Sequence, residues 1–172
     1  MKINHLKNGY SGYVFMFLKK YAKYLNLEMK IGDIGAGHLR NLKLFYDLGF
    51  KKLYALDREK TDNPLNVDLK KFVLQDIEKG IPFPNRFFDV TLCNFVLMFI
   101  EDSKREYVID ELMRTTNRFL IIETNPKEYE VKKKTFHKEY NFKEIVKYIE
   151  KSSDFELLQV REYYEKITAR RK

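Results

Sequence analysis

The chain has 172 residues, a formal net charge of +8 and charged side chains at 34% of its positions, and its 14 phenylalanines and 12 tyrosines supply apolar mass that disordered chains lack. This length suffices for one well-buried core and excludes two ordinary domains. The single cysteine, Cys93, excludes an internal disulfide and a multi-cysteine zinc site, and every apolar run is far shorter than the roughly 20 residues of a membrane span.

The sequence from Ser11 to Gly49 predicts a helix, a strand and a second helix. Ser11 has the chemistry of an N-cap, and apolar residues recur at helical spacing from Phe15 to Leu25. An apolar run then ends in glycines over residues 29–37. Leucine and phenylalanine recur at steps of three within residues 38–48, and Gly49 follows as a left-handed helix terminator.

The next part of the chain predicts strands at residues 51–57 and 72–76, then a strand beginning at Phe88. Pro64 interrupts the short connection between the first two, so we expect no full crossover helix there. Ser103 and Glu106 match a capping box and predict a helix whose buried side consists of Tyr107, Ile109, Leu112 and Met113.

The last third predicts a strand over residues 118–123, a helix opened by Asn141 with Glu144, and two closing segments at residues 155–160 and 163–169. We expect these two segments to form an antiparallel strand or hairpin. The alternation of apolar strands with amphipathic helices elsewhere predicts a mostly parallel sheet covered by helices.

The stretch around Gly35 and Gly37 carries the strongest chemical signal. Glycines at both positions allow a sharp turn and a close backbone approach to a ligand, and the following helix N-terminus suits a carboxylate or phosphate. Asp57 follows Gly37 by twenty residues, the distance at which a carboxylate reaches a ribose. Arg40 stands where dinucleotide-binding loops carry their third glycine, which disfavours a dinucleotide.

In these motifs the chain resembles the class I S-adenosylmethionine-dependent methyltransferases, in particular the small type 11 group. The similarity spans residues 29–124 and includes the segment 75–100, which resembles the family's D-I-x-x-G-x-P-F motif. The resemblance implies a three-layer αβα sandwich with strand order 3-2-1-4-5-7-6. It also implies one domain over residues 1–172, with an N-terminal helix and cover (1–27), a cofactor-binding core (28–124) and a substrate-side loop with closing helix and strands (125–172).

The resemblance further implies S-adenosyl-L-methionine as cofactor. In the family pattern, Asp33 helps hold the methionine ammonium, Asp57 takes the ribose hydroxyls and Asp76 meets the adenine amino group. The implied cofactor-binding residues are Asp33, Ile34, Gly35, Ala36, Gly37, Asp57, Arg58, Asp76, Ile77, Asn94 and Phe95.

The methyl acceptor is not specified by these motifs, and a small molecule and a nucleic acid both remain open. Enzymes that methylate adenine amino groups carry an N/D-P-P-Y/F tetrad, whereas residues 94–97 lack its prolines, so this acceptor is disfavoured. Cytosine C5 methylation needs a nucleophilic cysteine, and we interpret Cys93 as a packing residue. The other reading is a non-catalytic methyltransferase-like module that binds nucleic acid or a protein.

Residues outside the cofactor motifs supply the remaining hypotheses. His5 and His137 are candidate catalytic residues over the substrate opening, and His38 is expected to pack or bond near the cofactor. The segment Lys132–Lys138, with interleaved aromatics, could bind nucleic acid, although a solvated lysine-rich loop explains it as well. Asp102 and Asn125 do not suffice for a metal site, and we predict none. We expect a cytoplasmic protein with no membrane partner; the oligomeric state stays open.

Overall fold

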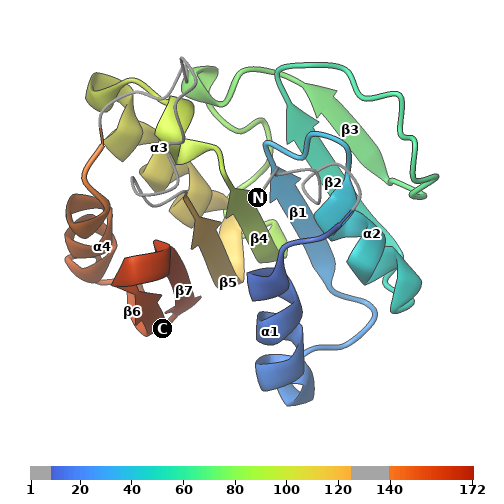
Figure 1. The fold of residues 1–172 in the computed structure, drawn as a ribbon, viewed down its shortest axis with the longest axis horizontal. Helices are drawn as coiled ribbons and strands as arrows, with labels where there is room; N and C mark the ends of the chain where they lie inside the picture. Colours follow the sequence, from blue (N-terminus) through green and yellow to red (C-terminus); the bar gives the residue numbers. More distant parts are fainter. Residues whose placement is uncertain (1–8, 125–139) are drawn as a thin grey trace.

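The computed structural model describes residues 9–124 and 140–172, which form a seven-stranded sheet between helices (Figure 1). The strand order is β3-β2-β1-β4-β5-β7-β6, which confirms the expected order. All pairs are parallel except those of β7, which is antiparallel to both β5 and β6, so the closing segments form a hairpin. The strands are β1 (Lys30–Ile34), β2 (Lys52–Asp57), β3 (Lys71–Leu74), β4 (Phe88–Asn94), β5 (Thr116–Glu123), β6 (Phe155–Arg161) and β7 (Lys166–Arg171).

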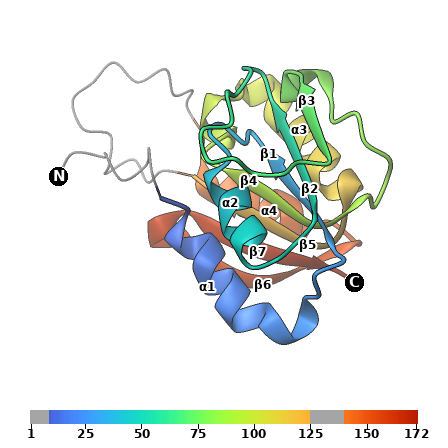
Figure 2. The same ribbon diagram turned by 90° about the vertical axis from the view of Figure 1, so that its right-hand side faces the viewer.

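Two helices cover each face of the sheet (Figure 2). The helices are α1 (Gly12–Tyr21), α2 (Arg40–Asp47), α3 (Asp102–Thr115) and α4 (Phe142–Glu150). β5 contributes Phe119 and Ile121 to the core under α1 and α2, and Leu120 and Ile122 to the core under α3 and α4, as the alternation of a strand requires. No helix among the described residues is long and apolar enough to cross a membrane.

The start of α3 differs from the expected capping box. The N-cap is Glu101, which makes no side-chain capping bond, and Ser103 already lies inside the first turn. The cause is Arg105, which is 5% exposed and donates to the carbonyl oxygens of Ile100 (2.9 Å) and Leu97. This buried arginine fixes the helix rotation so that Tyr107, expected in the core, is 45% exposed.

The other helix boundaries follow the sequence more closely. The Ser11 side chain caps α1 by accepting from the backbone N–H of Tyr13 (3.1 Å), and Asn141 caps α4 by accepting from Lys143 N–H (3.1 Å). Gly49 has φ +97°, the left-handed conformation predicted for the residue after α2. Residues 58–70, between β2 and β3, contain no helix, as Pro64 indicated.

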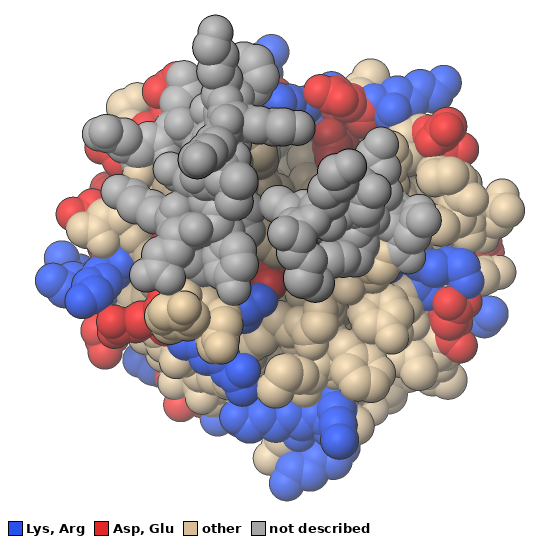
Figure 3. All heavy atoms as spheres, in the orientation of Figure 1, with Lys and Arg blue, Asp and Glu red and all other residues tan. Residues whose placement is uncertain are grey.

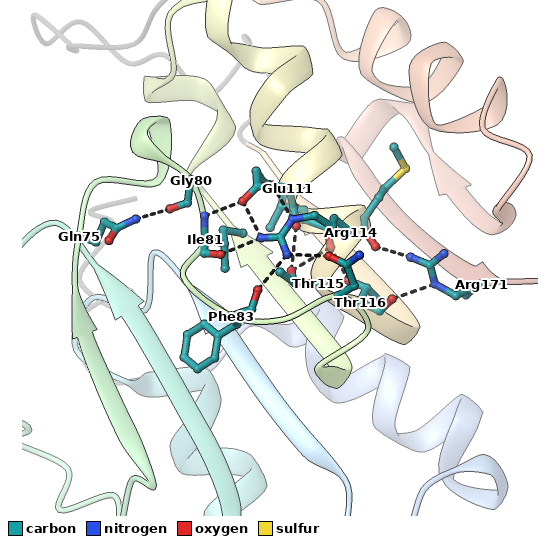
Figure 4. Close-up of polar contacts among 12 residues, drawn as sticks. Gln75, Gly80, Ile81, Phe83, Glu111, Arg114, Thr115, Thr116 and Arg171 are labelled. Carbon is teal, nitrogen blue, oxygen red and sulfur yellow. Dashed lines mark hydrogen bonds and ion pairs between the residues drawn. The ribbon is translucent and has the colours of Figure 1, made fainter.

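A polar cluster ties the segment before β4 to α3 (Figure 4). The Arg114 guanidinium donates to the carbonyl oxygens of Ile81 (2.8 Å) and Phe83 (2.9 Å), and Glu111 accepts from Ile81 N–H (2.8 Å) and pairs with Arg114. Gln75, at the start of the segment, donates to Gly80 O (2.6 Å). The Glu111–Arg114 ion pair on α3 therefore fixes the segment between β3 and β4 to this helix.

The substitution Arg114→Met should lower the free energy of unfolding by about 2 kcal/mol, because it removes these bonds and leaves partly buried carbonyls without a donor. Urea denaturation followed by circular dichroism measures the change. Lys104→Met, at an exposed position of the same helix, is the matched control and should shift stability by less than about 0.5 kcal/mol. Equal losses in the two variants would contradict a supporting role for Arg114.

Candidate functional site

Two pockets meet at the carboxyl edge of β1, β2 and β4. The first, the α1-side pocket, has a volume of about 310 Å³, and the second, the β3-side pocket, has about 270 Å³. Gly35, Gly37 and Phe95 line both pockets, so the two form one continuous groove. The α1-side pocket is also lined by Gly9, Tyr10, Ser11, Gly12, Ala36, Arg40, Asn41, Asn94 and Glu123. The β3-side pocket is also lined by Leu56, Asp57, Arg58, Glu59, Gln75, Asp76, Ile77, Glu78, Val96, Phe99 and Ile100.

The glycine loop after β1 lies at the junction of the pockets. Gly35 has φ +79°, and a Cβ at this position would lie 2.1 Å from Val96 Cγ2, so only glycine fits. Gly37 has φ +50°, but a Cβ there would meet no atom within 4 Å. Gly35 is thus fixed by packing, whereas Gly37 faces open space in the groove.

Asp57 ends β2 next to this loop. Its Oδ2 accepts from Gly37 N–H (2.8 Å) and its Oδ1 accepts from Glu59 N–H (2.9 Å). Two backbone donors therefore fix the carboxylate at the wall of the β3-side pocket. Each oxygen keeps a second lone pair for a ligand hydroxyl.

Asp33 on β1 is a buried carboxylate beneath the loop, with 2% of its surface exposed. Burial and, to a smaller extent, the negative charge of Asp57 raise the pKa of Asp33 to about 7, against the opposing effect of Arg40. The carboxyl group therefore changes charge near neutral pH. A cationic ligand group beside it would stabilise the ionised form.

Asp76 and Ile77 form the far end of the β3-side pocket. The Asp76 side chain caps the short 3₁₀ turn Ile77–Lys79 by accepting from Glu78 N–H (3.0 Å). Ile77 is 6% exposed and supplies an apolar wall. The Arg114 cluster holds the segment on which this turn lies.

A buried polar cluster closes the α1-side pocket. The Glu123 carboxylate, 3% exposed, accepts from Ser11 Oγ (2.5 Å) and Asn94 Nδ2 (2.9 Å) and pairs with Lys166. Phe95 has φ +61° and donates its N–H to Glu123 O (2.6 Å). Among the described residues, Asn94 Oδ1 is buried and has no hydrogen-bond partner.

The N-termini of α1 and α2 meet at the same pocket. Ser11 N–H donates to Asn41 Oδ1 (2.9 Å), which joins the two helix starts, and the Arg40 side chain lies between them with a bond to Gly9 O (3.4 Å). Neither helix carries an acidic residue in its first turn. This wall of the pocket is therefore electropositive and suits a carboxylate.

Most of the residues predicted for the cofactor site line the two pockets, but the prediction lacked several other residues of the site. Asp57, Arg58, Asp76, Ile77, Asn94, Phe95 and the glycine loop line the groove, whereas Asp33 and Ile34 are buried behind it. Among the lining residues that were not predicted, Ser11, Arg40 and Glu123 are charged or polar residues of the α1-side pocket. A charged residue at the end of the apolar strand 118–123 was the available signal for Glu123.

Other candidates lie elsewhere. His38, expected to pack or bond near the cofactor, is exposed and lines neither pocket. Cys93 is fully buried in β4, and burial raises its pKa, which confirms packing. His5, His137, Asn125 and Lys132–Lys138 lie outside the described residues. Residues 9–124 and 140–172 contain no group of three or more His, Cys, Asp or Glu placed to hold a metal ion.

Comparison with known proteins gives one family match. A family model described as a methyltransferase domain matches residues 32–121. None of the curated proteins matches the chain in sequence.

Solved structures share the fold at low sequence identity. Magnesium protoporphyrin IX methyltransferase from Synechocystis PCC 6803, with bound SAM, is 18% identical over 93% of this chain and 78% of its own, with a TM-score of 0.68. A SAM-dependent methyltransferase from Aquifex aeolicus is 22% identical over 88% of this chain and 86% of its own, with a TM-score of 0.63. A Burkholderia thailandensis 1,6-didemethyltoxoflavin-N1-methyltransferase is 13% identical over 93% of this chain and 77% of its own, with a TM-score of 0.69.

Proposed function

The chain belongs to the methyltransferase-domain family, and we propose that it transfers the methyl group of S-adenosyl-L-methionine to a small-molecule or nucleic-acid acceptor. The observation that carries this proposal is the continuous groove in which Gly35, Gly37 and Phe95 join an acidic pocket to an electropositive one. A cofactor with a nucleoside at one end and an amino acid at the other needs one pocket of each kind. A cytoplasmic location is part of the proposal.

The β3-side pocket fits the adenosine end. Asp57, fixed by two backbone N–H groups, would accept the ribose hydroxyls. Asp76 would accept from the adenine amino group, and Ile77 would pack on the ring. Gly37 leaves the space through which the cofactor passes between the pockets.

The α1-side pocket fits the methionine end. The helix N-termini and Arg40 would bind the carboxylate, and the buried Asp33 would stabilise the ammonium, directly or through water. Asn94 also lines this pocket and would contact the same end of the ligand. Ala36 and Phe95 would line the cofactor near the sulfonium.

The sulfonium supplies an already activated methyl group, so the residues of the chain mainly have to hold and align the reactants. The Glu123 cluster fixes Asn94 and Phe95 at the end of β4 by bonds to a side chain and to the backbone. His5 and His137 stay candidates for a proton-accepting role, and Lys132–Lys138 stays a candidate contact for a nucleic-acid acceptor.

The test is isothermal titration calorimetry with S-adenosylmethionine and S-adenosylhomocysteine. The wild type should bind both saturably, and Asp57→Ala should bind at least about tenfold more weakly because two charge-assisted hydrogen bonds are lost. Asp68→Ala, an exposed acid between β2 and β3, is the matched control and should bind as the wild type does. Folded wild-type protein that binds neither ligand would instead support the alternative, a non-catalytic binding module.

A further inference from the structure

An apolar groove lies on the face of the molecule that carries α1, away from the cofactor pockets. It has a volume of about 390 Å³ and is walled by Phe15, Leu27 and Leu48, with Leu18 and Phe50 buried beneath them. Whereas Ser11, at the start of α1, lines the α1-side pocket, the groove begins about one turn later and continues past the helix end. A ligand in this groove leaves the cofactor pockets open.

The exposure of these side chains makes the surface unusual. Phe15, Leu27 and Leu48 are 47%, 50% and 51% exposed, although they come from three different segments of the chain. Leu27 lies against Gly49, where a Cβ would be 3.5 Å from Leu27 Cδ1, so the α1–β1 connection and the end of α2 form one wall. Exposed apolar residues scattered singly need no explanation, but a contiguous hollow of them marks a binding surface.

The charges around the groove are basic. Residues 9–27 contain no acidic side chain, and Lys19 lines the groove with Lys23 one turn further along. Lys51 follows the buried Phe50 directly. The two neighbouring carboxylates are already paired, Glu28 with Lys52 (3.0 Å) and Asp47 with Lys43. Figure 3 shows this uncharged surface with Lys and Arg gathered along its lower edge.

The combination of shape and charge selects among occupants. A second copy of the chain, docked by the same surface about a two-fold axis, would face lysine with lysine. A partner with a flat surface has no side chains that project into the groove. A helix does, because its apolar side chains recur three and four residues apart on one face. Carboxylates on the flanks of such a helix would meet the lysine rim.

We propose that this groove binds an acidic amphipathic helix of a partner protein, which inserts apolar side chains between Phe15, Leu27 and Leu48 while its carboxylates face Lys19, Lys23 and Lys51. The proposal does not depend on methyl transfer. It requires only the surface formed by α1, the α1–β1 connection and the end of α2.

Two synthetic peptides of about 15 residues test the proposal, each with the same leucine face and with either glutamate or lysine on the polar face. Fluorescence anisotropy should show saturable binding of the glutamate peptide and at least tenfold weaker binding of the lysine peptide. The Phe15→Ser/Leu48→Ser variant should bind the glutamate peptide at least about tenfold more weakly, because two apolar contacts with the peptide are lost. Lys19→Glu/Lys23→Glu should reverse the preference between the peptides.

The controls separate this surface from the rest of the molecule. Tyr163→Ser, at a 63% exposed aromatic residue on the hairpin, should leave peptide binding unchanged. Calorimetry with S-adenosylhomocysteine on each variant reports separately on the cofactor site, and thermal melting reports on folding. The proposal is overturned if neither peptide binds, if both bind equally, or if the serine variant binds as the wild type does. Two other results would also overturn it, if the wild type binds no peptide. In the first, the wild type forms dimers and the Phe15→Ser/Leu48→Ser variant does not; in the second, the wild type binds phosphatidylglycerol vesicles and the variant does not.

Discussion

Alanine at Gly35 should destabilise the protein by about 3 kcal/mol or more, whereas alanine at Gly37 should leave it folded and abolish cofactor binding. At Gly35 the new Cβ would lie 2.1 Å from Val96 Cγ2 in a backbone conformation with φ +79°. At Gly37 the new Cβ meets no protein atom, so only the strain of φ +50°, about 1 kcal/mol, opposes folding. The methyl group would instead occupy the space proposed for the cofactor.

Urea denaturation and S-adenosylhomocysteine titration of both variants measure these effects. The double variant Gly35→Ala/Val96→Ala removes the Cγ2 contact and should recover the steric part of the loss but not the backbone strain. A Gly37→Ala variant that binds the cofactor as tightly as the wild type would show that the ligand does not pass over this residue. A Gly35→Ala variant of wild-type stability would refute the packing argument.

The substitution Asp33→Asn should stabilise the ligand-free protein above pH 7 and weaken cofactor binding by at least tenfold. Burial and the charge of Asp57 raise the pKa of Asp33 to about 7, so the folded protein holds this proton more tightly than the unfolded chain does. Between about pH 4 and pH 7 the folded state therefore binds more protons, and stability falls as the pH rises through that window. The loss is a few kcal/mol at most, at about 1.4 kcal/mol per pKa unit.

Ligand binding should show the opposite dependence on pH. The ammonium of the cofactor favours ionised Asp33, so wild-type affinity should fall as the pH drops below 7, and the Asp33→Asn variant should lose this dependence. Thermal melting and calorimetry from pH 5 to pH 8 measure both trends. If stability and affinity of the variant follow the same pH curves as the wild type, Asp33 does not titrate in this range.

The sequence predicted those parts of the fold and site that local patterns determine. The turn at Gly35 and Gly37 and the strand ending in Asp57 depend on a few neighbouring residues, so spacing alone located them. The capping box predicted at Ser103 is absent, and the helix starts instead where the buried Arg105 side chain bonds the carbonyls of residues 97 and 100 in the preceding segment. An N-cap side chain contributes about 1 kcal/mol to stability, which is less than the cost of leaving the buried Arg105 without its hydrogen bonds.

The contacts of Glu123, unlike its position at the end of a strand, could not be predicted from the sequence. Its partners are Ser11, Asn94 and Lys166, which come from three distant parts of the chain and meet only after the sheet is complete. No spacing rule connects them. Their polar character alone was visible in the sequence, and it fits exposed positions equally well.

The long reach of this cluster has a consequence for protein synthesis. The β3-side pocket is lined by residues that all lie between Gly35 and Ile100, so one continuous stretch of synthesis supplies all of its walls. The α1-side pocket depends on the position of α1, which is bonded to the sheet from Ser11 to Glu123 and from Tyr13 to Thr168, pairs that are 112 and 155 residues apart. The nascent chain therefore carries α1 without the partner of Tyr13 until Thr168 on β7 has been synthesised, so we expect the methionine end of the proposed cofactor site to form after the β3-side pocket.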